Sequence, residues 1–266
     1  MTPAYAFDNA LPAQLQRLRT LEELFDAGTF RHLEQLGVNS THRCLEVGAG
    51  GGSVAAWLAE RAHSVLATDL DTRYLTEGPN LAIKTHDILR HDLPDHAFDL
   101  VHLRQVLAWV PDRGKALTRL RATLKPGGVL LAEEMDFGAV APDPRMPGAE
   151  LLTRAIDAHT AVLVARSGFD PHYGRKLTAD MEAAGFIDVG GEGRATMWRA
   201  GNAGGRIWEL TLSQLRDPIV EAGLMSEHDI DQAIALCRDE LRCLSPLLLA
   251  AWGYASAGDG SAATAG

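Results

Sequence analysis

The feature that most constrains the fold is a regular alternation of short apolar runs and helical stretches between residues 43 and 135. Five runs indicate strands: RCLEVG (43–48), HSVLATD (63–69), LAIKTHD (81–87), FDLVHL (98–103) and VLLAEEM (129–135). Helical patterns lie between them at 53–61, 71–77 and 113–124, the last with Asp112 as its expected N-cap. Because strands alternating with helices are typical of βαβ units, the pattern predicts an open, doubly wound α/β sheet.

The segments on either side of this alternation look mostly helical. Leucines at three- and four-residue steps predict a helix over 9–36, broken at Gly28. After a Pro/Gly loop at 138–148, helical patterns follow at 149–166, 174–184, 203–222 and 226–243. A capping box from Ser226 to Asp229 opens the last of these helices. Strand patterns stand at 186–198, which contains a glycine-rich bend, and at 247–255, whose apolar character suits a place inside the sheet.

We therefore expect one α/β body with helical additions. A helical cap spans 1–40, the ligand-binding core spans 41–137 and a helical insertion spans 138–173. The rest of the core spans 174–255, with a second helical insertion at 201–245, and a disordered tail spans 256–266.

Charge and cysteine usage narrow the partners and the compartment. The 266-residue chain has a net charge of −10, which argues against nucleic acid and anionic membranes as partners. The three cysteines (Cys44, Cys237 and Cys243) show no CxxC spacing, so neither a disulfide framework nor a metal site is expected. The N-terminus lacks a signal-peptide pattern, and the apolar run 247–255 is far below the roughly 20 residues that span a bilayer. These observations predict a soluble, cytoplasmic protein without a metal.

A glycine-rich loop, LEVGAGGGS (45–53), joins the first strand to the first helix of the core. Glycines permit a close approach between a ligand and the backbone at a helix N-terminus. The dinucleotide fingerprint fails at its third position, which is Ser53, and a Walker phosphate loop is absent. Glu46 would oppose a pyrophosphate and favour a ligand with a positive end, such as a sulfonium or an ammonium group.

Two further carboxylates follow at the ends of the next strands. Asp69 can accept both hydroxyls of a ribose, and Asp87 can accept from an exocyclic amine beside a backbone N–H. Together with Glu46, these positions describe an adenosine that carries a cationic substituent. The alternative is that the loop and the carboxylates have a purely structural role, as a tight turn flanked by surface carboxylates.

The run CLEVGAGGGSVAAWLAERA, followed by VLATDLD, HDI and FDLVHLRQVLAWVPDRGKALTRLRATLKPGGVLLAEE, resembles class I S-adenosylmethionine-dependent methyltransferases. It is most similar to their small-molecule branch, the UbiE-like methyltransferase-domain family. The resemblance covers about 43–135 and implies a Rossmann-like sheet of seven strands whose last strand is antiparallel, the role that 247–255 matches. It also implies S-adenosyl-L-methionine as the cofactor, S-adenosyl-L-homocysteine as its product, and no metal.

Carried over by position, the resemblance assigns twelve residues to the cofactor. The methionine moiety would lie along Glu46, Gly48, Ala49, Gly50 and Gly52, and its far end would face Leu103, Arg104 and Gln105. Asp69 would bind the ribose, Leu70 would pack under the adenine, and Asp87 and Ile88 would contact the adenine edge. Arg104 would pair either with the methionine carboxylate or in a surface salt bridge.

The acceptor is expected to be a small organic molecule of secondary metabolism, methylated on O, N or C. No Asn/Asp-Pro-Pro-Tyr/Phe motif follows the fourth strand, which argues against planar amine and amide acceptors. Segments 4–36, 138–172 and 203–243 should build its pocket, with the tryptophans mainly packing in the core or lining a pocket. The catalytic candidates are His102, Tyr5 and His172, and Glu134, His159 and Tyr173 are further acid or base candidates.

Two alternatives and one partner remain open from sequence alone. The chain could bind the same cofactor without methylating, as a cyclase that uses the sulfonium electrostatically. It could also be a non-catalytic partner subunit that keeps the fold, although a disused site has no physical need for all three carboxylates. A homodimer is left open.

Overall fold

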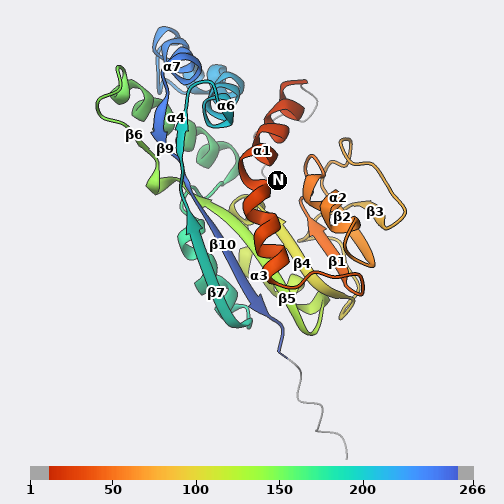
Figure 1. Ribbon diagram of the computed structural model, residues 1–266. Coiled ribbons are helices and arrows are strands. Elements are labelled where there is room, and N and C mark those ends of the chain that lie inside the picture. Colours follow the sequence, from red (N-terminus) through yellow and green to blue (C-terminus); the bar gives the residue numbers. More distant parts are fainter. Residues whose placement is uncertain (1–11, 257–266) are drawn as a thin grey trace, which may run out of the picture.

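Seven strands form one sheet in the order β3-β2-β1-β4-β5-β10-β7 (Figure 1). The computed structural model describes residues 12–256. The strands are β1 (Arg43–Val47), β2 (Ser64–Asp69), β3 (Leu81–Thr85), β4 (Phe98–Arg104), β5 (Leu124–Asp136), β7 (Ile187–Arg194) and β10 (Leu247–Tyr254). Strands β1 to β5 are mutually parallel, whereas β10 runs antiparallel to both β5 and β7. The predicted Rossmann-like α/β sheet with an antiparallel last strand is confirmed.

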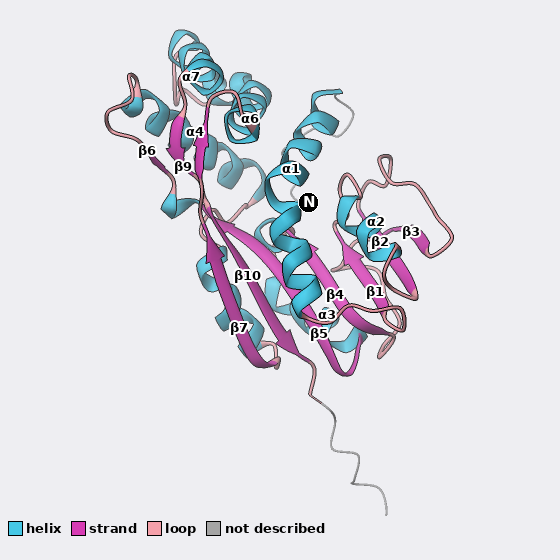
Figure 2. Ribbon diagram, viewed as in Figure 1, coloured by secondary structure: helices cyan, strands magenta, loops and turns pink. Residues whose placement is uncertain are grey.

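Helices cover both faces of this sheet (Figure 2). Alternate side chains of β1 point to opposite faces: Cys44 packs in one core cluster with Leu58, and Leu45 packs in another with Leu117. Helices α1 (Pro12–Gln35) and α2 (Ser53–Ala59) cover the first face, and α3 (Arg113–Thr123) and α5 (Leu177–Ala183) cover the second. Burial on both faces explains why the central strands are nearly continuous apolar runs.

A group of helices and a small sheet follows the carboxyl end of β5. The helices are α4 (Ala149–Ser167), α6 (Ala203–Glu221) and α7 (Glu227–Asp239), and α6 packs against α1, α4 and α7. The small sheet, in the order β6-β9-β8, consists of β6 (Ala141–Pro142), β9 (Arg242–Leu244) and β8 (Met197–Arg199). These elements gather at one end of the molecule (Figure 1), where they can enclose a ligand beside α1. Three single 3-10 turns complete the fold: η1 (Leu107–Trp109), η2 (Phe137–Ala139) and η3 (Gly174–Lys176).

Several sequence expectations were wrong in detail. Residues 71–77 form turns rather than a helix, because the Asp69 carboxylate accepts from the Asp71 N–H and the Asp71 carboxylate accepts from the Arg73 N–H. The expected break of α1 at Gly28 is absent; a Cβ there would lie 2.4 Å from Nη1 of Arg194.

Three further elements differ from the sequence prediction. The helix expected over 226–243 ends at Asp239, and 242–244 is a strand. The strand expected over 186–198 is divided between β7 and β8, and the helix expected over 174–184 starts as the 3-10 turn η3. The predicted N-caps were correct, because Asp112 accepts from the Lys115 N–H and Ser226 accepts from the Asp229 N–H. The predicted tail beyond residue 256 lies outside the described residues.

Within residues 12–256, no helix has the length and apolar character needed to cross a membrane. The same part of the chain contains no group of three or more His, Cys, Asp or Glu side chains suited to a metal ion. The three cysteines are buried and form no disulfide.

Candidate functional site

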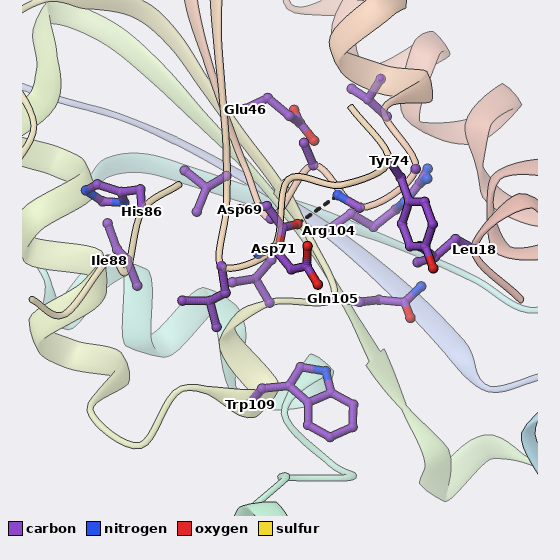
Figure 3. A pocket seen from close by; sticks show the side chains of 18 of the residues that line it. Leu18, Glu46, Asp69, Asp71, Tyr74, His86, Ile88, Arg104, Gln105 and Trp109 are labelled. Atoms are coloured by element: carbon purple, nitrogen blue, oxygen red, sulfur yellow. Dashed lines mark hydrogen bonds between the residues drawn. The ribbon is translucent and has the colours of Figure 1, made fainter. Parts of the chain in front are cut away.

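A cavity of about 290 Å³ opens at the carboxyl ends of β1, β2, β3 and β4, beside α1 (Figure 3). Ten of the twelve predicted cofactor residues line it: Glu46, Gly48, Ala49, Gly50, Asp69, Leu70, Asp87, Ile88, Arg104 and Gln105. The other two do not: Leu103 is fully buried in the core, and Gly52 is the N-cap of α2. The three carboxylates singled out in the sequence therefore face one shared cavity.

The glycine loop is held in a conformation that suits glycine. Gly48 and Gly50 have φ values of 68° and 55°, in the left-handed region. A Cβ on Gly48 would lie 2.3 Å from Cγ2 of Val106, which follows β4 and also lines the cavity. Backbone conformation and close packing both require glycine at position 48.

Asp69 joins the glycine loop to the turn that follows β2. Its Oδ2 accepts from the Gly50 N–H at 2.9 Å, and its Oδ1 accepts from the Asp71 N–H at 3.0 Å. Burial raises the pKa of this carboxyl, while these two N–H groups act in the opposite direction. Each carboxylate oxygen has two acceptor sites, and the Leu70 N–H also lowers the pKa of this carboxyl, so Asp69 retains at least one site for a ribose hydroxyl.

The end of β3 supplies a second acidic position beside an apolar wall. Asp87 accepts from the Leu89 N–H at 2.9 Å and pairs with Arg90 at 3.3 Å. Ile88 is buried, whereas Leu70 is 66% exposed and lines the cavity. Leu70, Asp87 and Ile88 all line the cavity, so they offer apolar surface and a carboxylate to a planar ring.

The N-terminus of α2 is already engaged by carboxylates of α1. Glu22 Oε1 accepts from the Ser53 N–H at 3.3 Å, and Asp26 Oδ1 accepts from the Ser53 hydroxyl at 3.1 Å. A phosphate group would normally occupy this position in a nucleotide-binding sheet. Here it would meet two anions in addition to Glu46, so the site disfavours a phosphate ligand and favours a cationic one.

Beneath α1, acidic and basic side chains alternate across the sheet. His102 lies between two carboxylates: its Nδ1 is 2.7 Å from Glu46 Oε2 and its Nε2 is 3.3 Å from Glu133 Oε2. Burial lowers the pKa of His102, but Glu46 and Glu133 outweigh it and raise the pKa to about 9. The same contacts hold the pKa of Glu133 well below its usual range, against the effect of burial. His102 is therefore an imidazolium at neutral pH.

Two sequence candidates have their contacts in this buried layer. His102 is fully buried, lines neither the 290 Å³ cavity nor the one beside it, and has both ring nitrogens engaged, which favours a positioning role over proton transfer. Arg104 lines the cavity, and its guanidinium donates to Asp26 Oδ1 at 2.9 Å and to Thr29 Oγ1 at 2.8 Å, both on α1. The sequence predicts that Arg104 pairs either with the methionine carboxylate or in a salt bridge within the protein, and the structure shows a salt bridge with Asp26.

The remaining candidates are more widely scattered. Tyr5 lies outside the described residues. His172 is about half exposed, lies 3.3 Å from Asp136 and lines neither of the two cavities. Tyr173 is fully buried in the hydrophobic core. Neither His172 nor Tyr173 lines the cavity that the cofactor residues form.

A smaller cavity of about 50 Å³ adjoins the first one. The two share Arg17, Leu21, Gln105 and Trp109 as lining residues. Gln105 has φ 58°, a left-handed conformation that is rare for a residue with a side chain and is often found at functional sites. The sequence candidates Glu134 and His159 both line the smaller cavity.

Sequence reasoning assigned segment 4–36 to the acceptor pocket without naming its residues, whereas the structure places five of them, all on α1, in the wall of the larger cavity. Gln14, Arg17, Leu18, Leu21 and Glu22 all line the larger cavity, and their spacing of three and four residues places them on one helix face. Polar residues interleaved with the leucine repeat of 9–36 could have indicated that this helix face lines a cavity. Tyr74 was also missed, because 71–77 was interpreted as a helix rather than as cavity wall.

Comparison with known proteins was made at the level of families, relatives and folds. Residues 45–132 match the model of a methyltransferase domain family. The chain is similar to methyltransferase str2 of Strobilurus tenacellus, with 32% identity over 57% of this chain and 56% of that protein. It is also similar to a trans-aconitate 2-methyltransferase of Variovorax paradoxus, with 30% identity over 54% of this chain and 52% of that protein. The chain thus spans about half the length of these curated relatives.

Among solved structures, the YcgJ protein of Bacillus subtilis superimposes with a TM-score of 0.56 and 13% identity, covering 85% of this chain and 97% of that one. A methyltransferase-like structure from Bacillus halodurans gives a TM-score of 0.54 and 15% identity, over 85% and 98% of the two chains. These likenesses show the fold. Residues 45–132 match the methyltransferase-domain family, and the solved structures share the fold that the sequence resemblance implied.

Proposed function

We propose that this chain, whose residues 45–132 match a methyltransferase-domain family, transfers a methyl group from S-adenosyl-L-methionine to a small organic acceptor. The single observation that carries the proposal is the convergence of Glu46, Asp69 and Asp87 on one cavity at consecutive strand ends. The carboxylates of α1 at the N-terminus of α2 add a reason why the ligand is a cationic nucleoside rather than a nucleotide.

The residues present fit this cofactor. Asp69 would accept the ribose hydroxyls, Leu70 and Ile88 would contact the adenine faces, and Asp87 would accept from the exocyclic amine. Glu46 and the loop from Gly48 to Gly50 would lie along the methionine moiety. The cofactor, when bound, supplies a methyl group already activated by its sulfonium charge, so the main contribution of the protein is positioning and exclusion of water.

The buried polar side chains under α1 would hold the cofactor-binding residues in a fixed conformation. His102 holds Glu46 from below, while Arg104 ties β4 to α1 through Asp26 and Thr29. A carboxylate fixed by such contacts loses little freedom when a cation binds, and preorganisation of this kind favours affinity. That the acceptor belongs to secondary metabolism, and that the protein is a cytoplasmic homodimer, stay predictions.

A structure of the chain with S-adenosyl-L-homocysteine, together with calorimetric titration of an Asp69→Ala variant, tests the proposal. We expect the adenosine between Leu70 and Ile88, and a loss of affinity of at least tenfold in the variant. An adenosine bound elsewhere, or an unchanged affinity in Asp69→Ala, would contradict it. Binding of S-adenosylmethionine without methyl transfer to any offered acceptor would instead favour the cyclase or partner-subunit alternative.

A further inference from the structure

Aromatic rings from five separate segments line the smaller cavity. Trp109 and Phe169 lie 4.4 Å apart between ring centroids, and Phe137 lies 5.9 Å from Phe169. Trp208 of α6 meets Phe137 at 6.3 Å and Trp198 at 6.4 Å. All five rings line the cavity. Aromatic walls that face an open space present ring faces and edges to a further aromatic ring.

The buried polar atoms of this cavity that make no hydrogen bond within residues 12–256 include Oε2 of Glu134, Nε1 of Trp208 and Nδ1 of His159. Glu134 is 1% exposed and Trp208 is 3% exposed. Unpaired buried polar groups are costly, so native proteins usually satisfy them with protein, water or ligand. Polar groups of this kind around one cavity can pair with a ligand that carries a hydroxyl group, because a hydroxyl both donates and accepts.

Glu134 stands at the wall between the two cavities. Its Oε1 accepts from the N–H groups of Val106 and Leu107, at 2.9 Å and 2.6 Å. Val106 lines the larger cavity, and its neighbour Gln105 lines both. These bonds fix the carboxyl group where a molecule in the smaller cavity would approach the methionine end of the larger one. Burial raises the pKa of Glu134 to about 8.

The charged groups around the smaller cavity disfavour a cationic ligand. Arg17 is buried and donates to Thr211 at 3.4 Å, and both residues line the cavity. Burial and the charge of Arg17 lower the pKa of His159 to about 3, so its imidazole is neutral at pH 7. The volume of about 50 Å³ corresponds to a handful of enclosed waters, at roughly 10–15 Å³ each, so a ring bound here would extend into the adjoining larger cavity.

We propose that the smaller cavity is the acceptor site and takes a single-ring phenol, neutral or anionic, whose hydroxyl meets Glu134; this inference rests on the proposed function. Methylation on oxygen forms a carbon–oxygen bond and breaks the carbon–sulfur bond of the sulfonium donor, whose electron pair stays on sulfur. The phenolic proton passes to Oε2 of Glu134. Trp208 stacks near the ring and donates its N–H to a ring substituent.

Calorimetry with the full chain saturated with S-adenosyl-L-homocysteine tests the ligand class. Catechol and phenol are the probes, with cyclohexanol as the saturated control and tyramine as the cationic phenol. We expect catechol and phenol to bind, and cyclohexanol and tyramine to bind at least tenfold more weakly. Equal affinity for cyclohexanol, or tighter binding of tyramine, would overturn the assignment.

Variants of the cavity separate this inference from the proposed function. Trp208→Leu should weaken catechol binding at least tenfold, whereas Trp57→Leu, in helix α2 and lining neither cavity, should change it less than twofold. Trp208→Phe keeps a ring and serves as the conservative variant, with an intermediate loss. Both leucine variants should bind S-adenosyl-L-homocysteine as the wild type does. If S-adenosyl-L-homocysteine fails to bind the wild type, the proposed function is wrong. If it binds but the affinity for catechol is unchanged in Trp208→Leu, only the assignment of the acceptor site is wrong.

Glu134→Gln tests the proton acceptor. The glutamine carbonyl can still accept from Val106 and Leu107, so a purely structural role would be preserved. We expect catechol and product affinities within threefold of wild type, but a kcat for catechol methylation at least tenfold lower, without the rise toward pH 8 that we expect of the wild type. A wild-type kcat and pH profile in Glu134→Gln would overturn the role of this carboxyl.

Discussion

The Nδ1 atom of His102 lies 2.7 Å from Oε2 of Glu46, and both side chains are buried between the sheet and α1. The two residues are direct neighbours in the parallel pairing of β1 with β4. An imidazolium thus holds, from within the core, the carboxylate that lines the cavity where the positive end of the cofactor is expected. Structural integrity and ligand binding should therefore depend on the same pair.

Replacing His102 removes the cation between two buried carboxylates. Loss of one partner of a buried ion pair typically costs about 3–5 kcal/mol, because the remaining charge stays desolvated. We expect His102→Asn to lower the free energy of unfolding by an amount in this range and to weaken cofactor binding, as measured by urea denaturation and calorimetry. The exposed His63→Asn is the control, and a loss no larger than in this control would show that the pair has no structural role.

The raised pKa of His102 gives stability a definite pH dependence. Its value of about 9 in the folded protein exceeds the ordinary 6.5, so its contribution is fully present below about pH 6.5 and is lost as pH rises through about 9. His159 acts in the opposite direction, because its lowered pKa removes stability as pH falls below about 6.5. Unfolding free energies of wild type and His102→Asn between pH 6 and 10 should converge toward the alkaline end. Parallel curves over this range would contradict the assignment.

Glycine 48 should be the least replaceable residue of the loop. Gly48→Ala combines a left-handed φ, which costs about 1–2 kcal/mol, with an overlap on Val106 that adds about 1–3 kcal/mol. Gly127→Ala, with φ 79° and open space around its Cβ, isolates the backbone cost alone. Adding Val106→Ala to Gly48→Ala should recover part of the stability. Equal losses for Gly48→Ala and Gly127→Ala, measured by thermal unfolding, would argue against close packing at the loop.

The ion pair between Arg104 and Asp26 should hold α1 over the cavity. Both side chains are largely buried, at 11% and 20% exposure, so the pair is worth more than a surface contact. We expect Arg104→Met to accelerate amide hydrogen exchange in α1 relative to α3. Arg31→Met is the matched control, because Arg31 lies on α1 and this change breaks its more exposed ion pair with Glu192. If both variants exchange alike, α1 is held by its apolar face rather than by this pair.

Sequence patterns predicted the sheet well and the long-range contacts poorly. The strands around Leu45, Leu100 and Leu130 were evident because burial on both faces makes each of them nearly continuously apolar. The short strands β6, β8 and β9 depend on pairing between segments as far apart as Ala141 and Leu244, which leaves no local pattern.

The candidate site divides in the same way. The positions of Glu46, Asp69 and Asp87 at the ends of successive strands were enough to predict that they lie together, because parallel strands end at one edge of the sheet. His102 and Glu134 lie on neighbouring strands and looked equally close to the cofactor in sequence. The pleat separates them, since His102 shares the α1 side of the sheet with Glu46 whereas Glu134 lines the smaller cavity.

Calorimetric titration of the wild-type chain with S-adenosyl-L-homocysteine, with ATP and NAD as competitors, tests the central claim most directly. We predict one site per chain, at least tenfold weaker in Asp69→Asn, from which neither phosphate-bearing nucleotide displaces the ligand. No binding to the wild type, or displacement by ATP or NAD, would show that the three carboxylates do not form a site for a cationic nucleoside.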